Sequence, residues 1–319
     1  MIEMEGVTKK YGNLTALRDV SFQIRKNETV GLLGRNGAGK TTLLNLMTGY
    51  FPPDAGSVRI AGKSMLDEAA ACKRMIGYLP EKPPLYDEMT VEEYLRFVCE
   101  LREVKKQGIR AHVDEILTLC SLQDVRSRLL GHLSKGYRQR AGIAQALCGA
   151  PEILILDEPT VGLDPKQTVE IRDLIRALSS EHTVIFSSHI LSEVQQLCDD
   201  AVILKEGRVA RVMSLDAGES ELMRLKLTAA GAEKRLMPAI RGLGCVKTAE
   251  EMEGSGGGCT RVLLTCLRKD EKGRAEDQLF RLMVSLDAPI REMTEEKDSL
   301  EEIFLRDTEG TEDREEAAQ

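Results

Sequence analysis

Two segments of this sequence combine glycine with hydroxyl and cationic side chains, which are the residue types that bind phosphate groups. The first, GRNGAGKT at residues 34–41, matches the pattern G-x-x-x-x-G-K-[ST]. The glycines let backbone N–H groups surround phosphates, and we predict that Lys40 binds the β- and γ-phosphates of a nucleotide while Thr41 ligates Mg²⁺. The predicted nucleotide-binding residues of this loop are Gly34, Arg35, Asn36, Gly37, Ala38, Gly39, Lys40, Thr41 and Thr42.

The second segment, HLSKGYRQR at residues 132–140, lies far downstream of the first. Ser134 precedes Gly136, and cationic side chains follow, which is typical of a turn that presents hydrogen-bond donors to an anion. We therefore predict that Ser134 and Gly136 also contact phosphate. The sequence raises the question of why one chain carries two such segments so far apart.

Two adjacent acids, Asp157 and Glu158, follow the apolar run ILIL. This run predicts a buried strand, whose end would deliver Asp157 to Mg²⁺ and place Glu158 beside it. Either acid alone could simply be solvated at the end of a strand. Downstream of a phosphate loop, however, the pair favours catalysis, with Glu158 orienting or deprotonating the attacking water.

The elements that would position these residues are strands alternating with helices. Up to about residue 215, short β-branched runs alternate with helical segments, which indicates a parallel sheet covered by helices. The expected strands around the site are Thr29–Gly34, Glu152–Pro159 and His182–His189. The phosphate loop should run directly into a helix.

Two further features belong to the same domain, which we place at residues 1–217. The run AVILKEGRVAR predicts a hairpin that turns at Glu206–Gly207. From about residue 87 the pattern becomes helical, with Thr90 and Glu93 forming a capping box. This pattern predicts a helical subdomain, at about 87–150, inserted into the sheet domain.

After about residue 217 the expected order becomes strand, helix, strand, strand, helix, strand. This order predicts a small ferredoxin-like α+β module at 218–305, with the turn GSGGG between its two middle strands. The run SLEEIFLRD predicts a last amphipathic helix. Residues 306–319 predict a disordered, solvated acidic tail, with an interaction device as the less favoured interpretation.

Charge and composition limit the classes of partner. The 319-residue chain has a net charge of −8, and residues 294–319 account for all of it. A neutral body with an acidic end argues against nucleic acid as a partner. No signal peptide is evident and no apolar run approaches the length of a membrane span, so we expect a cytoplasmic location. The eight scattered cysteines favour buried, reduced thiols over metal ligation.

In their order along roughly residues 1–215, these motifs resemble those of the nucleotide-binding subunit of ABC transporters. IGYLPE lies where this family has its Q-loop, LSKGYRQR resembles its signature and GLDP its D-loop. The resemblance implies a P-loop ATPase with a RecA-like core, an antiparallel β subdomain and a helical insertion. It implies ATP and Mg²⁺ as cofactors, Tyr11 stacking on adenine and His189 as the switch histidine. Taken singly, Tyr11 could be a core or surface aromatic and His189 an ordinary loop histidine.

The resemblance also implies an explanation for the two phosphate-facing segments. In this family two subunits pack head to tail, so that Ser134 and Gly136 of one close over the γ-phosphate held by Lys40 of the other. The implied partner is a second ATP-binding subunit, and an identical chain would give a homodimer with two ATP sites.

The stretch YLPEKPPLYDEMTVEEYLRFVCELR and the ending LEEIFLRDTEG resemble the ATP-binding subunits of ABC-2 type exporters, the gliding-motility-like and multidrug-like group. This implies a separate membrane permease that holds the chain on the inner face of the cell membrane. Leu85 and Tyr86, apolar residues in a loop bounded by prolines, would contact that permease.

Two positions depart from the family pattern. Lys135 and Tyr137 flank Gly136 where Gly and Gln are usual, but the two residues that touch phosphate are retained. Glu81 stands where most relatives have Gln, and we assign it to the Mg²⁺ and the attacking water. A carboxylate is a stronger Mg²⁺ ligand but repels the γ-phosphate, so the sign of the net effect stays open. Glu81 could instead be a solvated loop residue.

Two rival classes of function remain. A soluble ABC ATPase that remodels ribosomes or DNA would carry tandem cassettes or long coiled coils, whereas this sequence shows a single cassette and neither feature. A nucleotide sensor without turnover would lack a catalytic acid, whereas Glu158 is present.

Overall fold

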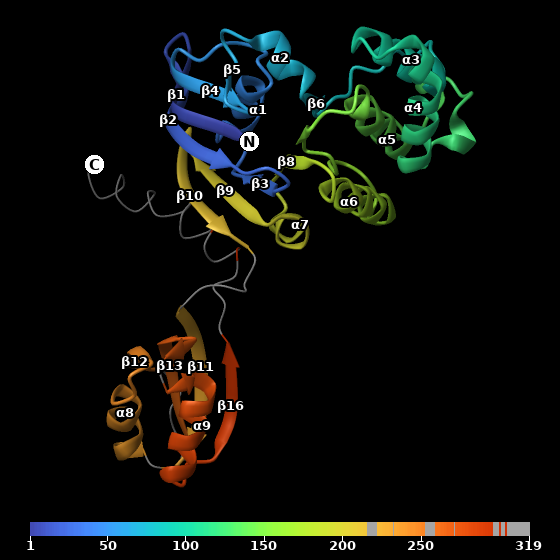
Figure 1. The fold of residues 1–319 in the computed structure, drawn as a ribbon. Helices are drawn as coiled ribbons and strands as arrows, with labels where there is room; N and C mark the ends of the chain where they lie inside the picture. Colours follow the sequence, from blue (N-terminus) through green and yellow to red (C-terminus); the bar gives the residue numbers. More distant parts are fainter. Residues whose placement is uncertain are drawn as a thin grey trace. The chain divides into compact units, whose positions relative to one another are not determined.

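The computed structural model describes residues 1–215, 222–231, 233–252, 259–270, 272–295, 300 and 304. The described chain forms two compact units, one comprising Met1–Leu215 and the other lying within Asp216–Ile303 (Figure 1). The domain boundary expected after residue 217 falls in a segment outside the described residues. The GSGGG turn, most of the last expected helix and the acidic tail also lie outside them.

A six-stranded sheet forms the centre of the first unit. Its strands lie in the order β10 (Arg208–Ser214), β9 (Asp200–Lys205), β3 (Thr29–Leu33), β8 (Thr183–Ser188), β7 (Ile153–Asp157) and β6 (Ile76–Leu79). Five of them run parallel and only β10 is antiparallel to its neighbour. All residues of β3, β7 and β8 are buried, as expected for parallel strands covered on both faces. The three strands predicted from the sequence are confirmed, each shorter by one or two residues at its ends.

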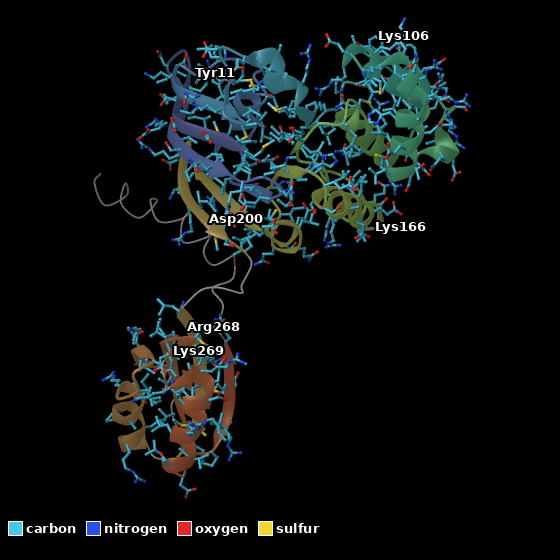
Figure 2. The ribbon with its side chains drawn as sticks, in the orientation of Figure 1. Tyr11, Lys106, Lys166, Asp200, Arg268 and Lys269 are labelled. Carbon is cyan, nitrogen blue, oxygen red and sulfur yellow. The ribbon has the colours of Figure 1, made fainter. Side chains whose placement is uncertain are left out.

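Helices cover this sheet (Figure 1). They are α1 (Lys40–Met47), α2 (Ala69–Arg74), α5 (Lys135–Leu147), α6 (Pro165–Ser179) and α7 (Leu191–Leu197). The start of α6 is fixed locally, because Asp164 Oδ1 accepts a hydrogen bond from the Gln167 backbone N–H at 2.8 Å and Pro165 occupies the first turn. Lys166 and Lys106 project into solvent from the first turns of α6 and α4 (Lys106–Leu119) (Figure 2).

A second, antiparallel sheet shares its core with the first. Its strands lie in the order β2 (Leu14–Ile24), β1 (Ile2–Tyr11), β4 (Ala55–Ile60) and β5 (Lys63–Ser64). Their inward side chains, such as Ile2 and Leu17, join residues of α1, β3, β7 and β8 in one buried cluster. This is the antiparallel subdomain that the family resemblance implied.

The helical subdomain contains α3 (Val91–Leu101) and α4, followed by two 3₁₀ turns, η1 (Gln123–Val125) and η2 (Leu130–His132), and then α5. The predicted capping box is confirmed, since the Glu93 backbone N–H donates to Thr90 Oγ1 and the Thr90 N–H donates to the Glu93 carboxylate. Arg102, which follows α3, donates to the backbone oxygens of Lys73 and Ile76 and so ties this helix to the strand β6.

The second unit has the element order that the sequence predicted. Its elements are β11 (Leu222–Ala230), α8 (Glu233–Arg241), β12 (Val246–Glu251), β13 (Cys259–Leu267), α9 (Ala275–Ser285) and β16 (Ile290–Glu295). The four strands form an antiparallel sheet in the order β12-β13-β11-β16, with a core that includes Leu227, Leu264 and Leu279. A small hairpin that the sequence did not predict joins β14 (Lys269–Asp270) to β15 (Gly273–Arg274).

Two sequence expectations concern the whole chain. Within the described residues, no helix is both long and apolar enough to cross a bilayer. All eight cysteines are free thiols. Six are buried, but Cys198 and Cys259 are only partly buried, so the expectation of buried thiols is wrong for these two.

Candidate functional site

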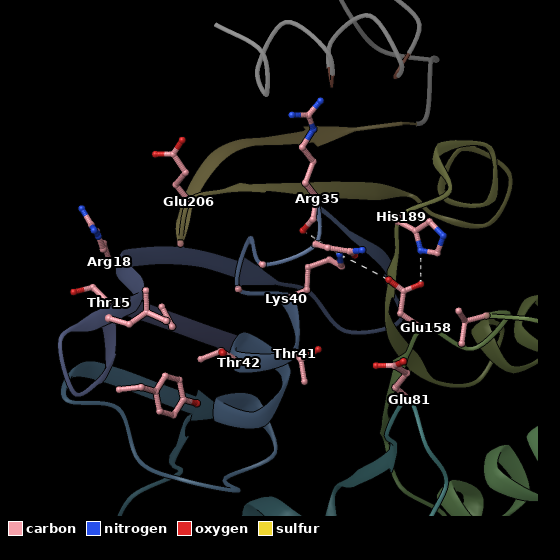
Figure 3. Close-up of a pocket in the computed structure, with 18 residues that line it drawn as sticks. Thr15, Arg18, Arg35, Lys40, Thr41, Thr42, Glu81, Glu158, His189 and Glu206 are labelled. Atoms are coloured by element: carbon pink, nitrogen blue, oxygen red, sulfur yellow. Dashed lines mark hydrogen bonds and ion pairs between the residues drawn. The ribbon is translucent and has the colours of Figure 1, made fainter. Parts of the chain in front are cut away.

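A pocket of about 710 Å³ lies in the first unit at the carboxyl ends of β3, β7 and β8 (Figure 3). Parallel sheets commonly bind their ligands at this edge. Eleven of the residues that the sequence assigned to nucleotide, metal or catalysis line the pocket. They are Tyr11, Arg35, Asn36, Gly37, Gly39, Lys40, Thr41, Thr42, Glu81, Glu158 and His189.

The phosphate loop connects β3 to α1 by a path that needs glycine. Gly39 has φ of 105° and directly precedes the first residue of α1. A Cβ atom there would lie 2.8 Å from Leu17 Cδ2 and 2.9 Å from the Ala16 carbonyl oxygen. No larger residue therefore fits. Residues 39–42, at the start of α1, line the pocket, and the unpaired N–H groups at the start of a helix favour a phosphate.

Lys40 lies at the centre of the loop, with only 7% of its surface exposed. Its ammonium group donates to the carbonyl oxygen of Gly34 at 2.7 Å, and its Nζ lies 3.8 Å from Glu158 Oε1. The Arg35 side chain, by contrast, is exposed and points away from Lys40 (Figure 3). Of the two cations in the loop, Lys40 is the one held inside it.

Glu158 and His189 contact each other directly. His189 Nδ1 and Glu158 Oε2 are 2.9 Å apart, and the two residues come from the ends of β7 and β8 (Figure 3). Glu158 has φ of 48°, in the left-handed region that non-glycine residues rarely adopt. Its backbone N–H donates to Ser187 Oγ at 2.9 Å, which holds this turn. Strained backbone of this kind is concentrated at functional sites.

Asp157 is buried beneath the pocket rather than lining it. Its Oδ1 accepts a hydrogen bond from Ser187 Oγ at 2.6 Å, whereas its Oδ2 has no hydrogen-bond partner. Burial raises the pKa of Asp157, and the nearby charge of Glu81 raises it further. A buried carboxylate oxygen without a partner is costly unless a cation or a donor satisfies it. Thr41 and Glu81 line the pocket and carry a hydroxyl and a carboxylate, which are oxygen groups of the type that Mg²⁺ prefers.

Besides Asp157, four predicted residues do not line the pocket. Gly34 and Ala38 belong to the phosphate loop but do not line the pocket. The carbonyl oxygen of Gly34 accepts a hydrogen bond from Lys40 Nζ. Ser134 and Gly136 lie elsewhere, at the start of α5. Ser134 is exposed and caps this helix by accepting the Tyr137 backbone N–H at 3.5 Å. Ser134 and Gly136, the residues of the second segment predicted to contact phosphate, are therefore absent from the pocket of their own chain.

Tyr11 reaches the pocket from the end of β1. It is 46% exposed and packs edge to face against Phe51, with ring centroids 5.8 Å apart. Of the alternatives that the sequence left open, a core aromatic is excluded by this exposure. A surface aromatic at the mouth of a nucleotide pocket can stack on a base.

The sequence did not predict several pocket residues. They are Leu14, Thr15, Ala16, Arg18, Val161, Glu206 and Gly207. Glu206 and Gly207 form the predicted hairpin turn, but only the structure shows that this turn packs on the phosphate loop. The Gly207 N–H donates to the Ala38 carbonyl, and the Arg18 N–H donates to the Gly207 carbonyl. Local sequence patterns contain no signal for contacts between such distant segments.

Comparisons with known proteins agree with this geometry. The family model described as "ABC transporter" matches residues 17–161. The uncharacterized ABC transporter ATP-binding protein YxlF of Bacillus subtilis (strain 168) is 39% identical over 210 residues, which cover 66% of this chain and 70% of YxlF. The bacitracin transport ATP-binding protein BcrA of Bacillus licheniformis is 37% identical over 218 residues, covering 68% and 70% respectively.

A third relative and a solved structure extend the comparison. The linearmycin resistance ATP-binding protein LnrL of Bacillus subtilis (strain 168) is 33% identical over 259 residues, covering 79% of this chain and 83% of LnrL. The dimeric structure of a bacterial ABC transporter cassette superposes with a TM-score of 0.63 at 28% identity, covering 68% of this chain and all of that cassette.

The fold and the pocket define a P-loop ATPase of the ATP-binding cassette type. The chain belongs to the ATP-binding subunits of ABC transporters.

Proposed function

We propose that this chain is the ATP-hydrolysing subunit of an ABC-2 type exporter, and that two such subunits bind ATP between them while a separate membrane subunit carries out transport. The observation that carries the proposal is the division of the site. Lys40, Glu158 and His189 meet in one pocket. Ser134 and Gly136, which have the residue types for a further phosphate contact, lie outside it.

Within one chain, the pocket residues have complementary roles in hydrolysis. The loop and Lys40 would hold the β- and γ-phosphates, with Tyr11 against the adenine. Thr41, Asp157 and Glu81 would hold Mg²⁺, which neutralises charge on the phosphates. Asp157 Oδ2, the buried oxygen without a partner, supports this ligand set.

Glu158 is the residue that would act on the attacking water. Its Oε2 is occupied by His189 Nδ1, which leaves Oε1 to accept a proton from the water or to orient it. Lys40 Nζ, 3.8 Å from Oε1, lies on the same side, where the γ-phosphate would be bound. His189 thus fixes the orientation of the carboxylate.

The second subunit would supply the signature segment. Ser134 is exposed at the start of α5, so a partner chain can approach it without rearrangement of the fold. Head-to-tail packing of two identical chains would give two equivalent sites. The ABC transporter cassette to which this chain is similar is dimeric, which supports the pairing of two such chains.

The exporter assignment rests on the relatives and on one exposed loop. BcrA and LnrL are named for bacitracin transport and linearmycin resistance. Tyr86 is 49% exposed and packs against Tyr94 and Phe97 of α3. Tyr86 therefore presents apolar surface that suits contact with a membrane permease, which would hold the chain at the inner face of the cell membrane.

Glu158→Gln tests the ATPase mechanism and the dimer together. The variant should bind ATP but lose about 100-fold or more of its turnover, the usual contribution of a general base. Because ATP would bind both halves, dimers should accumulate in Mg-ATP and be visible by gel filtration. A Glu158→Gln protein that still hydrolyses ATP, or that remains monomeric in Mg-ATP, would contradict the proposal.

A membrane experiment tests the exporter assignment separately. The chain, expressed with the candidate permease from its own genome, should co-purify with membranes, and Tyr86→Asp should release it. Thr90, which caps α3 near this loop, offers a control, since Thr90→Ser keeps the cap and should leave binding intact. Retention of Tyr86→Asp at the wild-type level would remove this loop from the interface.

A further inference from the structure

Glu193 is a buried acid that the mechanism above does not use. It lies on α7, five residues after Ser188, and is only 1% exposed. Its Oε2 accepts two hydrogen bonds, one from Thr160 Oγ1 and one from Ser188 Oγ, both at 2.9 Å. One carboxylate oxygen therefore joins the turn after β7, which contains Thr160, to the end of β8, which contains Ser188.

Thr160 and Ser188 lie close in sequence to Glu158 and His189, the two residues that contact each other in the site. Ser188 directly precedes His189, and its Oγ also accepts the Ile190 backbone N–H at 3.0 Å. The backbone on both sides of His189 is thus fixed through the hydroxyl that Glu193 orients. Thr160 lies two residues after Glu158, in the turn closed by the hydrogen bond from the Val161 N–H to the Glu158 carbonyl at 3.1 Å.

The other oxygen of Glu193 faces a third segment. Oε1 has no hydrogen-bond partner and lies 3.8 Å from Nε of Arg172, a residue of α6. The Arg172 Nε atom is also buried and has no hydrogen-bond acceptor. A buried ion pair of this kind adds little net stability, and apolar residues of similar volume would often be at least as stable. Stability alone therefore does not account for an acid at this position.

We infer that Glu193 is a positioning residue for ATP hydrolysis, whose Oε2 holds the Glu158 turn and the His189 turn at a fixed separation and so maintains the 2.9 Å contact between these two residues. The inference rests on the proposed roles of Glu158 and His189. Glu193 itself lies outside the residues that line the pocket and acts through Thr160 and Ser188.

A double-mutant cycle separates positioning from a general stabilising role. Glu193→Ala should lower kcat about 10- to 100-fold, the range expected when reacting groups are misplaced by about 1 Å. The KM for ATP should change little, because Lys40 and the phosphate loop are untouched. In wild type, His189→Ala should lower kcat strongly. In Glu193→Ala, adding His189→Ala should lower it little further, since the contact is already lost.

Conservative variants provide the rescue and guard against misfolding. Glu193→Gln keeps an oxygen acceptor for the two hydroxyls and should recover most of the kcat lost in Glu193→Ala. Ser188→Ala and Thr160→Val each remove one of the two hydrogen bonds with little change of volume, and each should lower kcat without raising KM. If Glu193→Ala does not fold, the cycle is run with Ser188→Ala and His189→Ala.

Thr183→Val is the matched control. Thr183 is fully buried on β8, like Ser188, but at the opposite end of the strand, and its Oγ1 accepts the Asn27 N–H at 2.9 Å. Loss of this hydroxyl should reduce thermal stability as much as Ser188→Ala does, while kcat at a permissive temperature stays at the wild-type level.

The outcomes of the cycle are distinct. If His189→Ala lowers kcat by the same factor with and without Glu193, or if Thr183→Val lowers kcat as much as Ser188→Ala, the positioning role of Glu193 is overturned and the proposed mechanism stands. If His189→Ala leaves wild-type kcat unchanged, the proposed role of His189 fails, and the inference about Glu193 fails with it.

Discussion

The two glycine-containing segments, residues 34–41 and 132–140, have similar chemistry but different surroundings. The first leaves the buried strand β3 and enters α1, so that Lys40 is enclosed beside Glu158. The second leads from a surface turn into α5, and Gly136 packs against Gln167 of α6, where a Cβ would lie 2.7 Å from Gln167 Cδ. Residue type indicates affinity for phosphate, but the neighbouring elements decide whether one chain can complete the site.

The sharpest contrast between the two segments should appear when each is disabled. Lys40→Ala removes the phosphate contact within the chain, so both ATP binding and turnover should be lost. Ser134→Arg blocks the exposed segment, so turnover should fall about 100-fold or more while ATP binding to the single chain remains at its wild-type affinity. Equilibrium binding of a fluorescent ATP analogue and steady-state ATPase assays measure the two quantities.

The control for this contrast is Ser121→Arg, an exposed serine between α4 and η1 that neither lines the pocket nor lies in the segment. It should leave both quantities unchanged. If Ser134→Arg lost ATP binding as a single chain, the segment 132–140 would act on the phosphate loop of the same chain. The proposed difference between the two segments would then be wrong.

Asp157 belongs to the part of the site that a single chain forms, so the effect of Asp157→Asn on stability should be measurable without a partner chain. Burial raises the pKa of Asp157 in the folded chain above its unfolded value of about 3.9. Folding therefore disfavours the charged form of Asp157, and charging this group lowers the free energy of unfolding. This loss of stability is absent below the unfolded pKa and grows as pH rises through the folded pKa. At pH 7 without Mg²⁺, Asn should stabilise the chain by about 1 kcal/mol while abolishing ATPase activity.

Calorimetric melting at several pH values checks this prediction. The gain in melting temperature of Asp157→Asn over wild type should shrink as pH falls toward 4, where the wild-type carboxyl becomes protonated. Asp199→Asn is the control, because Asp199 is exposed and accepts the Thr29 N–H at 2.8 Å, so no gain is expected. A lower melting temperature for Asp157→Asn at pH 7 would mean that the Asp157 charge is well compensated.

The smallest effect is expected at Glu81, which lines the same pocket. If its carboxylate contacts Mg²⁺, Glu81→Ala should raise the Mg²⁺ concentration needed for half-maximal hydrolysis by a few-fold, about the loss of one weak ligand contact. Nucleotide binding without metal should stay nearly unchanged. Mg²⁺ titrations that superimpose for the two proteins would return Glu81 to a solvated loop residue.

Much of this arrangement could be predicted from the sequence, because local signals determine it. The buried runs of β3, β7 and β8, the capping box at Thr90 and the glycine loop are each encoded within a few residues. The order of the motifs, through the family resemblance, assigned Glu158 and His189 to the site separately, and the structure adds their 2.9 Å contact.

The remainder depends on contacts between segments that are distant in sequence. The packing of Gly207 against the phosphate loop and the hydrogen bonds from Thr160 and Ser188 to Glu193 join different elements. Hydrophobic periodicity says which face of an element is buried, but it does not say which polar groups meet there. The unpartnered oxygen of Asp157 is likewise visible only once the surroundings of the strand are known.

In the proposed dimer, the segment 132–140 completes the site of the other chain. Lys40→Ala and Ser134→Arg, each combined with Glu158→Gln to prevent turnover, are mixed and tested for tightly held Mg-ATP. In a mixed dimer, one site carries both lesions and the other pairs an intact phosphate loop with an intact signature, so occluded ATP should appear only on mixing. Random pairing makes about half of the dimers mixed. Mixtures that occlude no more ATP than the separate variants, despite demonstrated subunit exchange, would contradict the account.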